Sequence, residues 1–479
     1  MSLRKGTVAR YAVGSVGTGG FGTLPGLVLV YYLTDTLGVA ALAAGLIVTL
    51  AKVWDVVVDP VIGAASDRDR AAHGTRRRLM IVGGLLLPVF FLLTFAVPPT
   101  LGSLAGAVWV LVAFLCAATA FSLFQVPYIA LPAELTGSYD ERTRLLTARV
   151  VVLTVAILAF GGGAPALRGL VPDEHAGYLL MGAVAGLVLG ASLLVTAGVE
   201  GRARRRDADP AADGGPQGPG ADGTPQSAEV ATPDTPTPGV LAHYRAGLVV
   251  LRTSPPFRAL LSAFVLQALA TGTMLAGAQY VATWVLDDEG AVTFLFAALV
   301  GPAVVFAPVW GRAARRIGKE RAFAVASGVF LGAAAALVVM YWSPGVWVYA
   351  VVAVAGAAYA GLQSLPMAML PDVVSHDAVT RGPGRAGTFS GLWTAGETTG
   401  FGLGTAVLTT VLATTGYVES RAEAVVVQPD SAVLGIVLAF TLLPAALVAV
   451  SLVPLRRYPL RRTDIEAAHT AARTEEHRA

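Results

Sequence analysis

Twelve long apolar runs dominate this chain, and each is long enough to cross a lipid bilayer as a helix. A spanning helix needs about 20 mostly apolar residues, because the hydrocarbon core of a bilayer is about 30 Å thick. The expected fold class is therefore an all-α polytopic membrane protein with twelve transmembrane helices. The expected spans are 11–34, 41–66, 79–98, 104–133, 144–170, 177–199, 258–286, 291–314, 322–342, 345–370, 386–415 and 431–454.

The composition supports this class and argues against a soluble enzyme. Hydrophobic residues make up 55% of the 479 residues and charged residues only 14%, whereas soluble domains usually carry about 25% charged residues. The sequence has no phosphate-binding loop, zinc-ligand spacing or nucleophile–base pattern, so we expect a protein that is not an enzyme and needs no cofactor. The single cysteine, Cys116, lies in an apolar run, where we expect a small core residue.

Basic residues gather in alternate loops, and this pattern orients the chain. The opposite loops contain only Arg168 and Arg421. Because basic loops stay on the cytoplasmic side, we expect a multi-pass protein of the inner (plasma) membrane with both termini in the cytoplasm. The basic loops serve orientation in this interpretation, so no nucleic-acid partner is expected. The clusters are Arg4, Lys5 and Arg10; Arg68, Arg70, Arg76, Arg77 and Arg78; Arg142 and Arg144; Arg202, Arg204, Arg205 and Arg206; Arg312, Arg315, Arg316, Lys319 and Arg321; Arg381 and Arg385; and Arg456, Arg457, Arg461 and Arg462.

A linker divides the chain into two sets of six spans. Residues 207–238 are rich in Pro, Gly, Asp and Ala and cannot bury a core, so we expect a disordered cytoplasmic linker. Two proline pairs, Pro127 with Pro366 and Pro132 with Pro371, are each separated by 239 residues. Such an internal repeat predicts a major facilitator fold, with pseudo-symmetric six-helix bundles at 1–206 and 239–479 and a substrate site between them.

Lys52, Asp55 and Asp59 are charged residues inside the second apolar run. Their spacing places them on one face of a helix, on successive turns. Ionised groups at membrane depth are costly and rarely persist without a partner or a task. We expect a cation-coupling site, in which Ser122 from the fourth span adds an oxygen; if the ion is Na+, Asp55 and Asp59 are its ligands. The alternative is a fixed ion pair between Lys52 and one aspartate.

Five further residues are candidates for the substrate site. Arg149 falls one to two turns into the fifth span, where a charge needs a polar cavity, a substrate or a structural partner such as Glu134 or Asp55. Trp393 could stack on a sugar ring or be an ordinary core or lipid-facing residue. Glu397 could titrate during transport or pair with Arg149. The full candidate set is Gln125, Tyr128, Arg149, Trp393 and Glu397.

The segment from Gly63 to Arg78, GAASDRDRAAHGTRRR, predicts a conformational latch at the cytoplasmic surface. Gly63 permits close approach of helices, and Asp67 could cap a helix end or pair with an arginine across the boundary between the halves. Such a charge network would break when a carrier changes state. The latch candidates are Gly63, Asp67, Arg68, Arg76 and Arg77.

Several motifs resemble one transporter family through nearly all twelve spans. They are YYLTDTLG (31–38), KVWDVVVDPVIGAASDR (52–68), GTRRR (74–78), VPYIALPAELT (126–136), DERTR (140–144) with Arg149, and FSGLWTAGET (389–398). Together they resemble the glycoside–pentoside–hexuronide:cation symporter family, the melibiose-carrier branch of the major facilitator superfamily. The resemblance implies symport of Na+, Li+ or H+ with a substrate. Its cation acids match Asp55 and Asp59, and its two basic positions match Lys52 and Arg149.

Other positions depart from that family pattern. Val58 stands where the pattern has an asparagine just before the second acid, and losing this oxygen favours H+ over Na+. The two sugar-binding aspartates of the pattern fall at Gly19 and Gln125, and its lysine in span eleven falls at Thr398. The coupling pair is therefore retained, while the contacts to a galactoside are largely lost.

The expected function is cation-coupled (H+ or Na+) symport of a glycoside or related small organic solute by alternating access. We expect a small-molecule substrate, a lipid bilayer around the protein and a monomer. The alternatives are a proton-driven exporter of a metabolite or drug, a carrier of an amphiphilic lipid-like solute, and a membrane sensor. The tail after Arg462 is short, which argues against a signalling domain and hence against a sensor.

Overall fold

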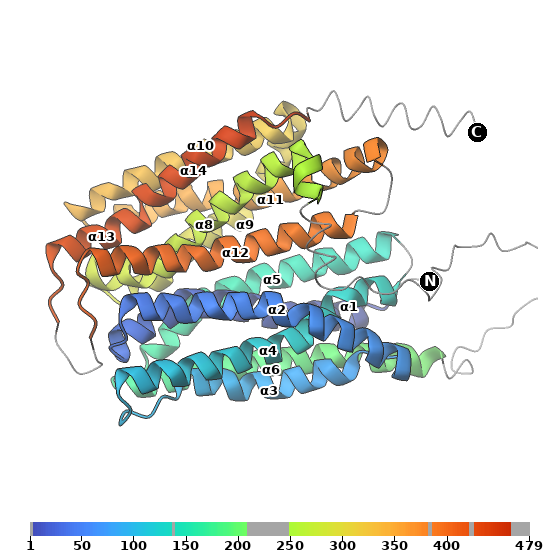
Figure 1. Ribbon diagram of the computed structural model, residues 1–479, viewed down its shortest axis with the longest axis horizontal. Coiled ribbons are helices and arrows are strands. Elements are labelled where there is room, and N and C mark those ends of the chain that lie inside the picture. The colour runs from blue at the N-terminus through green and yellow to red at the C-terminus, as the bar shows by residue number, and fades with distance from the viewer. Residues whose placement is uncertain (1–2, 137–138, 208–248, 382–385, 421–425, 461–479) are drawn as a thin grey trace, which may run out of the picture.

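The computed structural model describes residues 3–136, 139–207, 249–381, 386–420 and 426–460, and most of them are helical (Figure 1). The predicted linker lies outside these residues, apart from Asp207, which ends helix α6. The first set of helices is α1 (Lys5–Leu24), η1 (Pro25–Leu29), η2 (Tyr32–Thr36), α2 (Ala41–His73), α3 (Arg77–Phe95), α4 (Ser103–Leu135), α5 (Tyr139–Arg168) and α6 (Glu174–Asp207). The second set is α8 (Pro255–Trp284), α9 (Ala291–Ile317), α10 (Lys319–Ala336), η4 (Leu337–Tyr341), α11 (Trp347–Arg381), α12 (Ala386–Thr414), α13 (Asp430–Phe440) and α14 (Leu442–Arg456).

The expected all-α membrane class is confirmed. Eleven segments of the described residues are long and apolar enough to cross a membrane. Each predicted span coincides with a helical segment of the structure, and α12, with 29 residues, is the long helix outside those eleven. Long apolar runs predict such spans reliably, because the backbone in lipid has no partner other than itself.

Several helices extend beyond the expected spans, and the departures of the tenth and the first span have an evident physical cause. The tenth span was expected to end near residue 370, yet α11 continues through Pro366 and Pro371 to Arg381. Proline removes one backbone donor but tolerates continuation of a helix when neighbours support it. In the first span the regular helix stops at Pro25, and two short π-helical segments, η1 and η2, carry the chain to Thr36. A π segment re-pairs the backbone around the donor that proline lacks.

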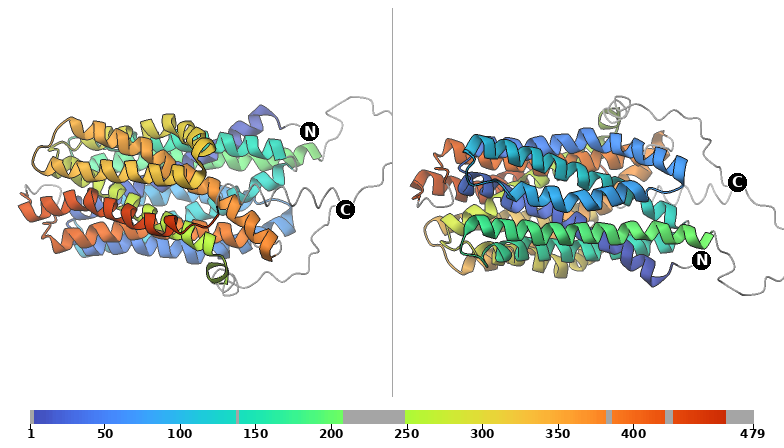
Figure 2. Two further views of the ribbon diagram at one scale, coloured as in Figure 1. Left: turned by 90° about the horizontal axis from the view of Figure 1, so that it is seen from above. Right: turned by 90° about the horizontal axis from the view of Figure 1, so that it is seen from below.

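The two sets of helices lie side by side along the long axis of the molecule (Figures 1 and 2). Helices α1 to α6 pack mainly on one another, and α8 to α14 do the same. The two sets meet where α2 packs on α12, where α5 packs on α9, and where η1 packs on α8.

These contacts are tightest at one end of the molecule, the end where α2 and α9 begin. A Cβ added to Gly45 of α2 would lie 2.0 Å from Oγ1 of Thr409 on α12. A Cβ added to Gly161 of α5 would lie 2.0 Å from the ring of Phe296 on α9. Only glycine allows such close approach. The two halves are therefore in close backbone contact at the end of the molecule opposite to the start of α1.

Candidate functional site

The predicted cation residues lie together on α2. The ammonium of Lys52 is 3.7 Å from Oδ2 of Asp55, and these side chains are 32% and 20% exposed. Asp59 lies one turn further on and is also partly buried. Its Oδ1 atom is buried with no hydrogen-bond partner among the described residues. One ammonium thus pairs with Asp55 and acts on Asp59 at longer range, where water has limited access. Such an arrangement favours uptake of a cation.

Ser122 brings a hydroxyl from α4 to this cluster. Its side chain is 4% exposed and hydrogen-bonds the carboxyl of Asp59. Within the described residues, no group of three or more His, Cys, Asp and Glu side chains is placed to hold a metal ion. The side chains near Asp59 therefore offer two carboxylates and one hydroxyl to an ion.

Lys52 connects the cluster to the other half of the molecule. Its aliphatic stem packs on α12 at Gly402, where an added Cβ would lie 3.1 Å from Cγ of Lys52. That distance is tighter than an ordinary van der Waals contact, so Gly402 leaves the stem its space. A change in the charge of Asp55 would alter the position of an ammonium whose stem rests on the opposite bundle.

In the first half, Gln125 and Arg149 are partly exposed and Tyr128 is not. Oε1 of Gln125 accepts a hydrogen bond from Thr18 of α1 at 2.8 Å. Tyr128 has no exposed surface; its hydroxyl lies 2.9 Å from the Ser15 hydroxyl and donates to the carbonyl of Tyr11. Tyr128 therefore ties α4 to α1 in this conformation and does not face a ligand.

Arg149 lies over the ring of Tyr128. Its guanidinium carbon is 5.2 Å from the ring centroid, which is a cation–π contact. Among the described residues, no carboxylate forms an ion pair with Arg149, although a pair with Asp55 or Glu397 was one alternative; the side chain of Glu134 lies outside the description. The ring of Tyr128 thus packs against the guanidinium of Arg149. The positive charge of Arg149 has no carboxylate partner among the described residues.

In the second half, Trp393 is a packing residue in this conformation. Its side chain is 3% exposed and stacks on Phe264, with ring centroids 4.1 Å apart and an interplanar angle of 18°. In this conformation Trp393 is therefore an ordinary core residue, which was one of the alternatives for it. Glu397, one turn later on α12, remains partly exposed.

The latch residues gather at the end of α2 and the start of α3. Arg76 is buried and lies 2.7 Å both from Oδ1 of Asp67 and from Oγ of Ser66. Arg68 and Arg77 are exposed. Asp67 therefore pairs with an arginine of its own half, and the described residues include no ion pair between Asp67 and an arginine of the other half.

Gly63 does not mark a close helix contact here. A Cβ added to it would lie 3.7 Å from Val126, which is an ordinary contact distance. The tight approach of α2 to the second half is at Gly45 instead.

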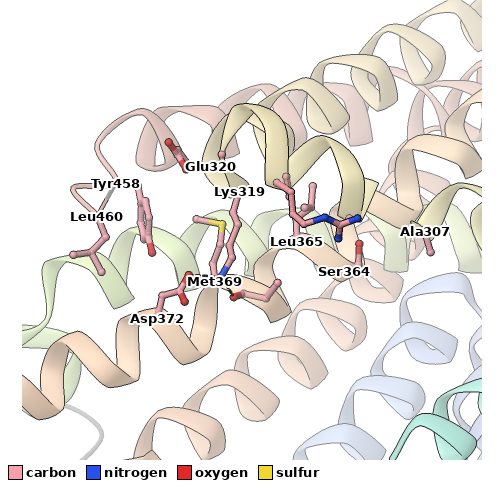
Figure 3. Close-up of a pocket in the computed structure, with 14 residues that line it drawn as sticks. Ala307, Lys319, Glu320, Ser364, Leu365, Met369, Asp372, Tyr458 and Leu460 are labelled. Carbon is pink, nitrogen blue, oxygen red and sulfur yellow. Dashed lines mark hydrogen bonds and ion pairs between the residues drawn. The ribbon is translucent and has the colours of Figure 1, made fainter. Parts of the chain in front are cut away.

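A cavity of about 590 Å³ lies in the second half, between α9, α10, α11 and the residues after α14 (Figure 3). Nζ of Lys319 binds Oδ2 of Asp372 at 2.6 Å on its wall, and Glu320 and Tyr458 line it as well. None of the five substrate candidates lines this cavity. It is therefore separate from the predicted site.

Asp35 is a buried carboxyl between the two halves and is not among the candidates predicted from the sequence. Its side chain is 4% exposed and lies in η2. Tyr417, which follows α12, donates to its Oδ1 at 2.5 Å. Asp35 stands within YYLTDTLG, a motif used only for the family resemblance. Asp35 directly follows the first apolar run, and an acid next to such a run is a signal that could have singled it out.

Comparison with known proteins identifies the family. A family model described as MFS/sugar transport protein matches residues 10–219 and 224–462. The chain belongs to this family. Its members are membrane transporters, which confirms the expectation that the protein is not an enzyme. It also supports the resemblance to cation symporters stated from the motifs.

Individual relatives align with this chain over most of their length. An uncharacterized symporter of Synechocystis sp. is 25% identical over 93% of this chain and 91% of the relative. A glucuronide carrier protein homolog of Escherichia coli is 24% identical over 95% of this chain and 92% of the relative. The mouse sodium-dependent lysophosphatidylcholine symporter 1 is 23% identical over 94% of this chain and 84% of the relative.

Solved structures of transporters share the fold at low sequence identity. The nucleoside transporter NupG gives a TM-score of 0.64 with 9% identity, covering 95% of this chain and 98% of its own. A bacterial homolog of the lysosomal transporter Spinster, inward-facing and unoccupied, gives 0.63 with 13% identity, covering 97% and 96%. At such identities the likeness concerns the fold, and it agrees with the expected transporter architecture.

Proposed function

We propose that this protein is a symporter that uses a cation gradient to move a sugar-like solute across the membrane. The observation that carries the proposal is the cluster on α2, where Lys52 pairs with Asp55 one turn before Asp59. The stem of Lys52 rests on α12 at Gly402. The charge of the cluster and the contact between the halves thus involve the same side chain. The family and its named symporters support this function, and they do not favour the alternative of an exporter.

The coupling step follows from electrostatics. With both carboxylates charged, the cluster carries one net negative charge in a partly dry place. A cation that binds there neutralises the cluster and relaxes the hold of Asp55 on Lys52. The contact of Lys52 with α12 then differs between the loaded and empty states, and only such a difference can shift the equilibrium between conformations.

We propose H+ as the coupling ion. A proton needs one carboxylate oxygen, and the buried Oδ1 of Asp59 is available to it. An Na+ ion would need several oxygens, and Val58 supplies none where the family pattern has an amide. If sodium nevertheless drives transport, Asp55 and Asp59 with Ser122 are its ligands.

The substrate that we propose is a sugar carrying a carboxylate. Arg149 lies on the ring of Tyr128 without a carboxylate partner among the described residues. An arginine in that position pairs well with a planar carboxylate, through two parallel hydrogen bonds. A glucuronide has this group, and one relative is named as a glucuronide carrier protein homolog. Gln125 on α4 and Glu397 on α12 are the partly exposed polar groups that we assign to the sugar hydroxyls.

We further propose that both termini are cytoplasmic and that the protein works in the plasma membrane as a monomer. The basic clusters of the sequence are the basis for this orientation. The end at which Gly45 touches Thr409 is then the outer end. The described state is one in which the carrier is closed to the outside.

Transport in proteoliposomes tests the proposal. Purified protein is reconstituted, and uptake of a radiolabelled glucuronide is followed under an inward proton gradient, an inward sodium gradient, or none. We expect accumulation under the proton gradient and its loss when a protonophore is added. Equal uptake under all three conditions would show that no cation drives the substrate.

A further inference from the structure

Asp35 is a buried carboxyl held by neutral side chains, the hydroxyls of Thr34 and Tyr417 and the indole of Trp284. It lies in η2, between the spans Lys5–Leu29 and Ala41–His73. The Tyr417 hydroxyl donates to its Oδ1 at 2.5 Å, and the Thr34 hydroxyl donates to its Oδ2 at 2.6 Å. Among the described residues, no basic side chain forms an ion pair with it. A charged carboxylate that is buried without a cation is expensive, so the neutral form is favoured here.

The carboxyl is buried only because the two halves meet at this point. Thr34 and Asp35 belong to the first half, whereas Tyr417 and Ser420 follow α12 of the second half. The backbone N–H of Ser420 donates to the carbonyl of Thr34 at 3.0 Å, and its hydroxyl donates to the carbonyl of Asp35 at 3.0 Å. The Thr34 hydroxyl also lies 2.7 Å from the hydroxyl of Tyr280 on α8. We call Thr34, Asp35, Tyr280, Tyr417 and Ser420 the outer gate.

The outer gate accommodates a proton without losing its contacts. The Thr34 hydroxyl has one hydrogen, and it lies within reach of Asp35 Oδ2 and of the carbonyl of Val30, at 3.2 Å. When Asp35 is charged, Thr34 donates to it. When Asp35 is protonated, it donates to Thr34, and the hydrogen of Thr34 turns to Val30. The same separation of 2.6 Å serves both states.

Other charged and titratable groups surround the gate on every packed element. Burial raises the pKa of Asp35 to about 7; the hydrogen bonds from Thr34 and Tyr417 oppose this rise, and the negative charge of Glu174 adds to it. Burial also raises the pKa of Tyr31 and of Tyr417 far above neutrality, so both stay protonated. The remaining neighbours are Tyr280 on α8, Glu174 on α6, Glu419 beside Tyr417, and the Arg168–Glu289 ion pair between α5 and the loop before α9.

We propose that Asp35 is a proton-binding site of the outer gate, which takes up a proton from the outside when the gate closes and returns it when the gate opens. The proposal rests on the orientation and alternating access given above. Because Asp35 lies at the outer end and is buried whenever that end is closed, its proton does not reach the cytoplasm. The site therefore senses external pH and adds nothing to the number of ions carried with the substrate.

The direction of the pH effect follows from linkage. In the open gate Asp35 meets water and its pKa returns to the ordinary value of about 4. The carboxyl thus binds its proton more tightly in the closed gate, so protonation stabilises closure. This stabilisation is complete below about pH 4 and is lost as the pH rises through the closed-state value of about 7.

Distance measurements between spin labels test the proposal. Leu104, where α4 begins, and Val346, just before α11, are 79% and 81% exposed, and both lie at the outer end of their halves. Each is replaced by cysteine in a Cys116→Ser background, and the full-length protein is labelled in lipid nanodiscs. We expect the shorter, closed distance to dominate at pH 5 and to give way to a longer one around pH 7. In Asp35→Asn, which mimics the protonated form, the closed distance should persist up to pH 9.

Three further variants separate the outcomes. Tyr417→Phe removes a donor to the charged carboxylate and should move the midpoint upward by about one pH unit; this variant decides the matter if Asp35→Asn fails to fold. Glu289→Gln breaks the ion pair with Arg168 and leaves Asp35 in place, so the closed fraction should still respond to pH. Asp59→Asn should keep the transition even when driven uptake is lost, so failure of coupling and failure of the gate are distinguishable. A wild-type distance that does not respond to pH, or a transition unchanged in Asp35→Asn, would overturn the proposal.

Discussion

Gly45 of α2 touches Thr409 of α12 so closely that the glycine has no room for a side chain. An added Cβ would lie 2.0 Å from Oγ1 and 2.9 Å from Cβ of Thr409. The contact joins the two halves at the end where the outer gate closes. Further along the same helix, Gly63 would accept a Cβ at 3.7 Å from its nearest neighbour, Val126. Helix α2 thus carries one glycine, Gly45, that the closed contact requires. It carries another, Gly63, whose position has room for a side chain.

A side chain at position 45 should hold the carrier open to the outside. In Gly45→Val the extra methyl groups must be fitted only when the outer end closes, and overpacking of this kind costs about 1–3 kcal/mol. The equilibrium should shift away from the closed state by about tenfold to a hundredfold. The measurement is the rate of driven uptake, together with the accessibility of an outer-end cysteine at position 346. Gly63→Ala is the matched control and should transport normally. Unchanged uptake in Gly45→Val would contradict the role of this contact.

Arg149 should distinguish acidic from neutral sugars. Loss of its charge in Arg149→Gln removes a charge-assisted hydrogen bond, worth about 1.5–3 kcal/mol, so the Kd for a glucuronide should rise by about tenfold or more. Binding of a neutral glycoside of the same size, where it occurs, should change much less. Isothermal calorimetry with both ligands measures the difference, and Arg149→Lys should restore part of the affinity for the acid. An equal loss for both sugars would mean that Arg149 supports the fold and not the carboxylate.

The two partners of the latch pair should differ in their contribution to stability. Arg76 is buried against Ser66 and Asp67, whereas the side chain of Asp67 is 62% exposed. Removing the charge in Asp67→Asn should cost about 0–1 kcal/mol, as for other exposed pairs. Arg76→Ala also removes a packed stem and a buried hydrogen bond, and should cost about 1–3 kcal/mol. Thermal unfolding in detergent compares them, and a larger loss of Tm in Asp67→Asn would contradict this account.

Much of the architecture follows from the sequence, because lipid leaves the backbone few choices. A run of about 20 apolar residues has to become a helix in a bilayer, so the helical regions were predicted closely. Their ends were less predictable where a helix leaves the membrane. Beyond that boundary nothing apolar marks the end, and α11 runs on through Pro371 to Arg381 in spite of two prolines.

Side-chain contacts between segments far apart in the chain could not be predicted from the sequence. The grouping of Lys52, Asp55 and Asp59 follows from helical spacing, and their positions on α2 agree with it. The burial of Trp393 depends on Phe264, which lies more than a hundred residues away. Asp35 meets Tyr417 only after both halves have folded and closed. Local patterns predict which residues share a helix face, whereas tertiary packing decides which of them reach a ligand.

In the proposed mechanism, protonation of the acidic pair on α2 drives the movement of substrate. Its most direct test compares wild type with Asp59→Asn in proteoliposomes, by uphill uptake of glucuronide under a proton gradient and by exchange of labelled for unlabelled glucuronide without one. We expect Asp59→Asn to lose uphill uptake and to retain exchange, because substrate binding remains and the link to the ion is gone. Uphill uptake by Asp59→Asn at the wild-type rate would contradict it.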